Sequence, residues 1–192
     1  MSTVQLPFDT SFHFNEQLRE VPNVPSEMQC AIAFLQSQLD DDDTDAHQRI
    51  QLYGLIGVYA RILGDFLLAC TALKTAIALS EQIQDECLKT VNQLRLAHVY
   101  QWQRQFEISD RLFAQILVRC VHNPTLEPYL DFAFQHAGKC KFDQRQYAKA
   151  QWCFEQALAI RLRKGDPTLI ESTQYALEIT KRRAMTVATF KS

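Results

Sequence analysis

The chain has 192 residues, of which 47% are hydrophobic, so it is long enough for one sizeable domain or a short array of repeats. Its 22 acidic and 20 basic residues leave a net charge of −2, which excludes the overall positive field that attracts nucleic acid. Only 5 glycines and 6 prolines interrupt the chain, too few for many tight β-turns, and an all-α protein is therefore expected.

The first 25 residues differ from the rest of the chain. They contain three prolines and no sustained hydrophobic period, which predicts an extended or disordered arm over residues 1–25. The arm also carries Phe8, Phe12 and Phe14, more aromatic residues than a solvated tail usually has. We expect these rings to pack on the domain or on a neighbouring molecule; the alternative is that they are scattered exposed side chains.

Targeting signals and cysteine usage both indicate a cytoplasmic protein. The N-terminus has no basic stretch followed by an apolar run, so no signal peptide is expected, and no eighteen consecutive apolar residues predict a membrane helix. The 6 cysteines include no C-x-x-C pair. They are interpreted as small buried hydrophobic residues in a reducing compartment, and no metal or cofactor is expected.

A first helix is predicted to begin with Ser26 as its N-cap and to continue with an apolar stripe through Leu39. The acidic segment Asp40–Asp45 then interrupts the pattern. It lacks the glycine turn and the distal glutamate of a calcium loop. We interpret it as a solvated loop whose last acids favour the N-terminus of the next helix.

The rest of the chain is predicted to form pairs of helices followed by one unpaired helix. The pairs are residues 46–64 with 66–83, residues 86–103 with 106–121, and residues 126–142 with 147–165. A last helix over residues 166–183 has Pro167 in its first turn, where proline is tolerated.

The second helices of the three pairs share one pattern of large and small residues. An aromatic residue is followed by a small residue three places on, a bulky residue four places later and an apolar residue after three more. The starts of the pattern lie 40 and 41 residues apart. Its members are Phe66, Ala69, Leu73 and Ala76, then Phe106, Ser109, Phe113 and Ile116, then Tyr147, Ala150, Phe154 and Ala157.

Each first helix carries a small residue nine places before this pattern begins. These residues are Gly57, Ala97 and Gly138. Small side chains on both helices would allow the two axes to approach closely, with the bulky residues filling the grooves. A chance pattern in a generic helical bundle would account for one copy but not for three in register, so we expect a stacked array of repeats.

These positions resemble the tetratricopeptide repeat family over roughly residues 46–180. The usual repeat of that family has about 34 residues, and the longer period here is similar to the variety found in kinesin light chains. The resemblance implies a right-handed α-solenoid of antiparallel helix pairs with about three repeats. The expected organisation is an arm over residues 1–25, a repeat domain over residues 26–185 and a tail over residues 186–192.

No catalytic constellation is evident, because the 5 histidines are dispersed and no H-E-x-x-H, G-x-S-x-G or phosphate loop is present. An enzyme is therefore not expected. In tetratricopeptide arrays the first helices line a concave groove, and the resemblance implies that this face binds a partner. The groove residues predicted from the register are Arg61, Arg95, His98, Trp102, Gln135, His136 and Lys139.

This set is cationic and aromatic, and it favours an acidic peptide or a C-terminal carboxylate as partner. The alternative is that these side chains form solvated helix faces. The leading function is a non-catalytic adaptor that binds a protein or peptide. A chaperone for a secreted or assembling client, or a regulator that senses a signalling peptide, is the alternative. Self-association is also expected as a way to cover the unpaired last helix and the aromatic arm.

Overall fold

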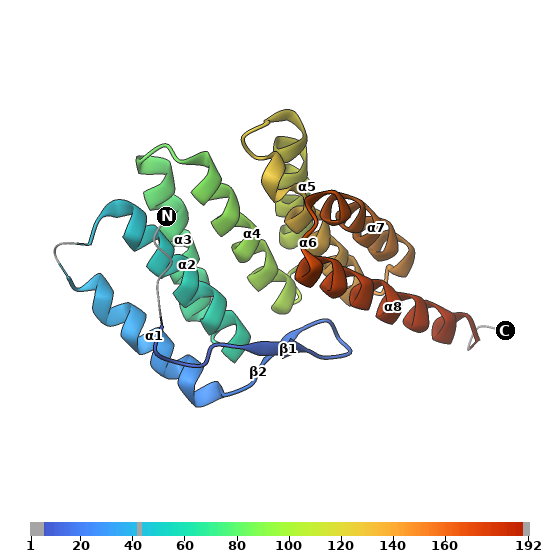
Figure 1. The fold of residues 1–192 in the computed structure, drawn as a ribbon, viewed down its shortest axis with the longest axis horizontal. Coiled ribbons are helices and arrows are strands. Elements are labelled where there is room, and N and C mark those ends of the chain that lie inside the picture. The colour runs from blue at the N-terminus through green and yellow to red at the C-terminus, as the bar shows by residue number, and fades with distance from the viewer. Residues whose placement is uncertain (1–5, 42–43, 190–192) are drawn as a thin grey trace. The chain divides into compact units, whose positions relative to one another are not determined.

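The structure is a computed structural model that describes residues 6–41 and 44–189. Its contacts divide the chain into two compact units, Met1–Val99 and Tyr100–Ser192. The elements, labelled in Figure 1, are β1 (Phe12–Phe14), β2 (Glu20–Pro22), α1 (Pro25–Leu39), α2 (Ala46–Leu63), α3 (Phe66–Gln82), α4 (Glu86–Trp102), α5 (Phe106–His122), the 3-10 turn η1 (Glu127–Tyr129), α6 (Leu130–Asp143), α7 (Tyr147–Lys164) and α8 (Pro167–Thr189).

The helix starts in the first unit follow from short-range hydrogen bonds. Asp45 caps α2 through a capping box, in which its carboxylate accepts from the Gln48 backbone N–H while the Gln48 side chain accepts from the Asp45 backbone N–H. The expectation that the acidic segment supports the next helix is thus confirmed at Asp45. The expected Ser26 cap is wrong: α1 begins at Pro25 and its N-cap is Val24, because proline supplies the fixed φ of a first helical residue.

The N-terminal arm is ordered over its described residues and contains a small β-hairpin. β1 and β2 pair antiparallel, with Phe12 opposite Pro22 and Phe14 opposite Glu20. Asn15 shapes the turn, because its side-chain oxygen accepts hydrogen bonds from the backbone N–H groups of Gln17 and Arg19. β2 also contacts α2, so the arm packs on the helices of the first unit. Its hairpin is the β-structure that an all-α expectation did not include.

Close helix contact explains the glycines at the small first-helix positions. A Cβ added at Gly57 of α2 would collide with the Leu73 side chain of α3. A Cβ added at Gly138 of α6 would lie 2.6 and 2.7 Å from ring atoms of Phe154 in α7. In both pairs the small first-helix residue faces the bulky third member of the second-helix pattern. The predicted packing is confirmed for α2 with α3 and for α6 with α7.

A turn with left-handed backbone recurs two residues before each second-helix pattern. Gly64, Arg104 and Arg145 have φ values of 85°, 61° and 59°. In each turn the backbone N–H of the following residue donates to a carbonyl five residues back, at 2.8 to 2.9 Å. The same hydrogen bonding in all three copies therefore holds two arginines in a conformation that usually favours glycine.

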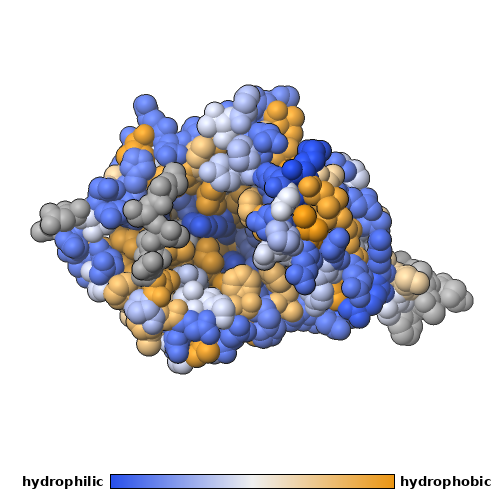
Figure 2. Space-filling view, in the orientation of Figure 1, coloured by the Kyte–Doolittle hydropathy of each residue, from blue (hydrophilic) through white to orange (hydrophobic). Residues whose placement is uncertain are grey.

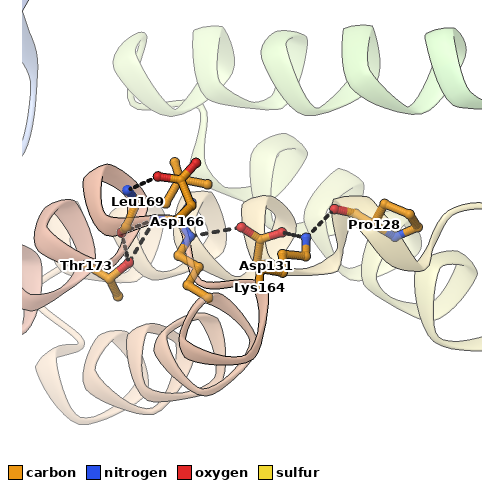
Figure 3. Close-up of polar contacts among 7 residues, drawn as sticks. Pro128, Asp131, Lys164, Asp166, Leu169 and Thr173 are labelled. Carbon is orange, nitrogen blue, oxygen red and sulfur yellow. Dashed lines mark hydrogen bonds and ion pairs between the residues drawn. The ribbon is translucent and has the colours of Figure 1, made fainter.

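A buried polar network fastens α6, α7 and α8 in the second unit (Figure 3). Asp131 is fully buried and accepts from Arg161 Nε at 2.9 Å and from Lys164 Nζ at 2.5 Å. Arg161 also donates to the Thr173 hydroxyl and to the Leu169 carbonyl of α8. These bonds give the last helix, expected to be unpaired, a fixed attachment to the preceding pair. α8 continues to Thr189, beyond the expected start of the tail at residue 186.

The small second-helix positions offer a direct stability test. Ala150 is fully buried, so Ala150→Phe is expected to lower the free energy of unfolding by about 1–3 kcal/mol through overpacking. Ala148 lies two places earlier on α7 and is exposed, so Ala148→Phe serves as the control. Equal thermal midpoints for the Ala150→Phe variant and the wild type would contradict close packing at this position.

Candidate functional site

The predicted groove residues are more enclosed than a row of solvated side chains. Arg95 and His136 are half-buried. The other five are less than a tenth exposed: Arg61, His98, Trp102, Gln135 and Lys139. Arg61, Arg95 and His98 belong to the first unit, and the remaining four belong to the second. The structure thus gives two separate groups of enclosed polar and cationic side chains on first helices.

In the first unit the hairpin supplies a carboxylate to Arg61, one of the predicted groove residues. Arg61 of α2 donates from Nη1 to Glu20 Oε2 of β2 at 3.0 Å, and these side chains are 5% and 6% exposed. Tyr59, also on α2, donates from its hydroxyl to Thr10 of the arm at 3.4 Å. The arm therefore covers part of the α2 face on which a partner was expected.

The surface around the hairpin is mixed in character. Figure 2 shows hydrophobic side chains, in orange, at the surface of the first unit beside hydrophilic ones, in blue. Phe12 of β1 is 41% exposed and packs edge to face on Phe14, with ring centroids 5.6 Å apart. Phe8 instead makes an edge contact with Phe34 of α1 at 5.9 Å. The aromatic residues of the arm are thus divided between internal packing and exposure.

Arg95 of α4 lies near Arg61 but is bonded differently. Its Nη1 donates to the neutral Asn92 side-chain oxygen at 3.1 Å, and Asn92 in turn donates to the Leu88 carbonyl. Burial lowers the pKa of Arg95 to about 10; the nearby Arg61 acts in the same direction, and Tyr59 opposes it. The guanidinium remains protonated at neutral pH, and its enclosure makes an added anion favourable.

Gly54 of α2 provides the space for this guanidinium. A Cβ added at Gly54 would collide with Arg95 Nη1 and would lie 2.7 Å from Asn92 Oδ1. The absence of a side chain at Gly54 therefore allows the guanidinium of Arg95 to pack against the backbone of α2. Sequence reasoning found Arg95 but missed Gly54, Asn92 and Glu20, the residues that decide how its guanidinium is held and how its neighbour Arg61 is neutralised.

In the second unit the predicted residues on α6 are mostly enclosed. Gln135 is 3% exposed, and neither atom of its amide has a hydrogen-bond partner within the described part of the chain. Lys139, one turn further along α6, is 4% exposed. A buried amide without partners costs free energy, so Gln135 is a second position at which a ligand or water would be stabilised.

The cysteines offer little nucleophilic chemistry. Burial raises the pKa of the Cys140 thiol to about 12 and that of Cys153 to about 11, so both stay protonated at neutral pH. None of the six cysteines forms a disulfide, and Cys30 is exposed, contrary to the expectation that every cysteine is buried. Within residues 6–41 and 44–189, no three His, Cys, Asp or Glu side chains form a group that could hold a metal ion.

One further pocket lies outside the predicted set. It has a volume of about 290 Å³, lies between α1, α2 and α3, and is lined by Leu39, Asp40, Tyr53, Ile56, Leu68 and Thr71, among others. None of the predicted groove residues lines it. No helix in the described ranges combines the length and the apolar character that a membrane crossing requires.

Comparison with known proteins identifies the fold. No family model and no curated protein matches the sequence. The structure is similar to BtubC (BKLC) from P. vanneervenii, with a TM-score of 0.60 and 19% identity over 83% of this chain and 64% of that one. It is also similar to a putative kinesin light chain from Podosopora anserina with nearly identical TPR-like repeats, with a TM-score of 0.58 and 16% identity over 84% of this chain and 81% of that one.

These similarities confirm a TPR-like repeat fold and the expected class, a right-handed α-solenoid of antiparallel helix pairs. The chain spans less than two thirds of the length of BtubC. At these identities the likeness concerns the fold alone.

Proposed function

We propose that the chain is a non-catalytic adaptor that binds an acidic protein or peptide on the first-helix faces of its repeats. The observation that supports it most directly is Arg95, a half-buried cation whose hydrogen-bond acceptor, among the residues that the structure describes, is a neutral amide. Enclosing a charge without a counter-ion is unfavourable unless a partner supplies one. An acidic partner would supply it through charge-assisted hydrogen bonds.

Other features agree with a binding role in a reducing, cytoplasmic setting. The second unit adds Gln135, whose buried amide lacks partners among the residues described, and Lys139 on the same helix. None of the six cysteines forms a disulfide. The net charge of −2 does not draw an acidic partner to the chain as a whole, so recognition would depend on these local groups.

Charge reversal at Arg95 tests the proposed function. A partner is first captured with the tagged full chain from the native organism, identified by mass spectrometry and purified. Arg95→Glu is then expected to weaken its binding by about tenfold or more, because an attraction becomes a repulsion. Lys74→Glu changes an exposed lysine on α3, a second helix, and should leave the dissociation constant unchanged.

Charge reversal at the second-unit cation, Lys139→Glu, would not test binding. Lys139 is only 4% exposed, and a buried acid there would disturb folding. The proposal fails if Arg95→Glu and wild type bind the purified partner equally. It also fails if the Lys74→Glu control weakens binding as much as Arg95→Glu does, since the effect would then be one of net charge.

A further inference from the structure

We propose that the outward face of α7 is a second docking surface, and that it binds an amphipathic α-helix with an acidic flank from another protein. The surface, called the α7 seam below, is formed by the exposed residues Ala148, Trp152, Glu155, Ala159 and Leu162. It lies wholly within the second unit and on a second helix. It therefore shares no residue with the first-helix site of the proposed adaptor and does not depend on Arg95.

The α7 seam has the spacing of a surface that another helix covers. Its members follow one another at intervals of four, three, four and three residues, which is the spacing of the contact side of a coiled coil. Trp152 and Leu162 are 54% and 57% exposed, so the large apolar side chains of the seam lie in solvent. Ala148 and Ala159 leave room beside Trp152 for the side chains of a second helix. The seam therefore matches a helix better than an extended peptide.

Trp152 distinguishes α7 from the other second helices. The residues at the same place in the repeat are Thr71 of α3 and Arg111 of α5, and both are polar and exposed. Arg111 forms a surface ion pair with Glu107 of its own helix, as is usual on a solvated face. At this position α7 instead presents a large apolar ring to water. Tryptophan is one of the residues in which the binding energy of protein interfaces is concentrated.

The ring of Trp152 is oriented before a partner binds. It packs edge to face on Phe134 of α6, with ring centroids 5.6 Å apart and an interplanar angle of 79°. This contact restrains the ring, while about half of the side chain remains exposed. An aromatic residue held in this way loses less conformational freedom on binding than a freely rotating side chain.

The charges beside the seam specify the partner. Lys149 and Arg163 are exposed and lie fourteen positions apart, so they share one flank of the seam. Within residues 6–41 and 44–189 the structure gives neither of them an ion pair. The acid within the seam, Glu155, accepts a hydrogen bond from Gln151 of the same helix at 2.7 Å. A partner helix with acidic residues along the facing flank can therefore pair with both cations.

A second copy of this chain fits the seam less well than such a helix. In parallel pairing, Glu155 would face its own counterpart. In antiparallel pairing, the flank that carries Lys149 and Arg163 would face the same basic flank of the copy. Like charges at either contact are unfavourable, and an acidic helix from another protein avoids both arrangements.

Two synthetic helices that differ in flank charge test the proposal. The acidic probe is a peptide of three EIAALEK heptads, and the basic probe is a peptide of three KIAALKE heptads with the same apolar side. Each is titrated at low salt into the isotope-labelled full chain, where flank charges are screened least. The indole N–H resonance of Trp152 is followed by NMR and is identified by its absence from the Trp152→Phe variant.

The acidic probe is expected to shift the Trp152 resonance and to bind about tenfold more tightly than the basic probe. The net charge of −2 would favour the basic probe, so this preference can only come from local charges. The double variant Lys149→Gln with Arg163→Gln should remove the preference, because it leaves the flank neutral.

Two single variants test the apolar part of the seam. Trp152→Ser should weaken binding of the acidic probe by about tenfold or more. Ala159→Gln keeps the contact between Trp152 and Phe134 and should weaken binding as well, because a bulky amide then occupies a small position of the seam. Leu67→Ser removes an exposed apolar side chain from α3, another second helix, and should leave binding unchanged.

The proposal fails if the acidic probe leaves the Trp152 resonance unmoved, if the basic probe binds as tightly, or if binding survives both Trp152→Ser and Ala159→Gln. Two further results would overturn the choice of partner. A Trp152 resonance that responds to phosphatidylserine vesicles but not to the acidic probe would assign the face to a membrane. Self-association in sedimentation that is lost in Trp152→Ser would assign it to a second copy. Circular dichroism confirms that each variant is folded.

Discussion

Asp131→Ala is expected to destabilise the second unit by about 3–5 kcal/mol. The substitution leaves the Arg161 guanidinium, 2% exposed, without its carboxylate, and it also removes an acceptor from Lys164. Both tryptophans, Trp102 and Trp152, belong to the second unit, so the fluorescence midpoint of urea unfolding reports this loss directly.

A matched control uses a carboxylate that is paired but exposed. Glu107 bonds Arg111 one turn along α5, and their side chains are 89% and 66% exposed, so Glu107→Ala should change the midpoint little. The double variant Asp131→Leu with Arg161→Leu should recover much of the loss, because it removes the stranded charge together with its partner. If Asp131→Ala unfolds at the same urea concentration as Glu107→Ala, the network does not hold α8 in place.

Glu20→Gln is expected to weaken the hairpin's attachment to α2 by about 3–5 kcal/mol. Arg61 would keep its charge in a buried setting but lose the carboxylate at 3.0 Å, and the repulsion between Arg61 and Arg95 would no longer be offset. Amide hydrogens of residues 12–22 should then exchange with solvent much faster, roughly tenfold for each 1.4 kcal/mol lost. Hydrogen exchange with mass spectrometry measures this protection.

Glu16→Gln supplies the control for the hairpin, because Glu16 is an exposed carboxylate in the same turn. Unaltered exchange in the Glu20→Gln hairpin would show that backbone and aromatic contacts alone hold the arm.

The repeat and its register could be predicted because they depend on side-chain volume along a helix. Gly57 and Gly138 were identified from spacing, and each meets the predicted bulky residue. Rules for helix starts also predicted that the last acids of residues 40–45 support the next helix, and Asp45 does so as the N-cap of α2. They failed at Ser26, because a proline immediately before it was equally able to begin the helix.

Other features depend on contacts that a linear pattern does not contain. Arg104 and Arg145 adopt the left-handed conformation in turns that have the same hydrogen-bond pattern as the Gly64 turn. Residue type alone does not reveal this pattern. Glu20 pairs with a residue 41 positions away, and nothing in residues 1–25 marks it as the acid that would be buried. The predicted groove set therefore contained the arginines but not the groups that distinguish one from the other.

The position of Glu20 along the chain bears on how such a site could diverge among proteins built from similar repeats. Duplication of a helix pair copies its arginines, its glycines and its turn, but it cannot copy an acid that lies in a separate leading segment. Two arrays with the same helix pairs would then differ in the net charge beside Arg61 solely through the segment that precedes them. The charge of this helix face can therefore change by exchange of a short hairpin, while every helix in the array keeps its sequence.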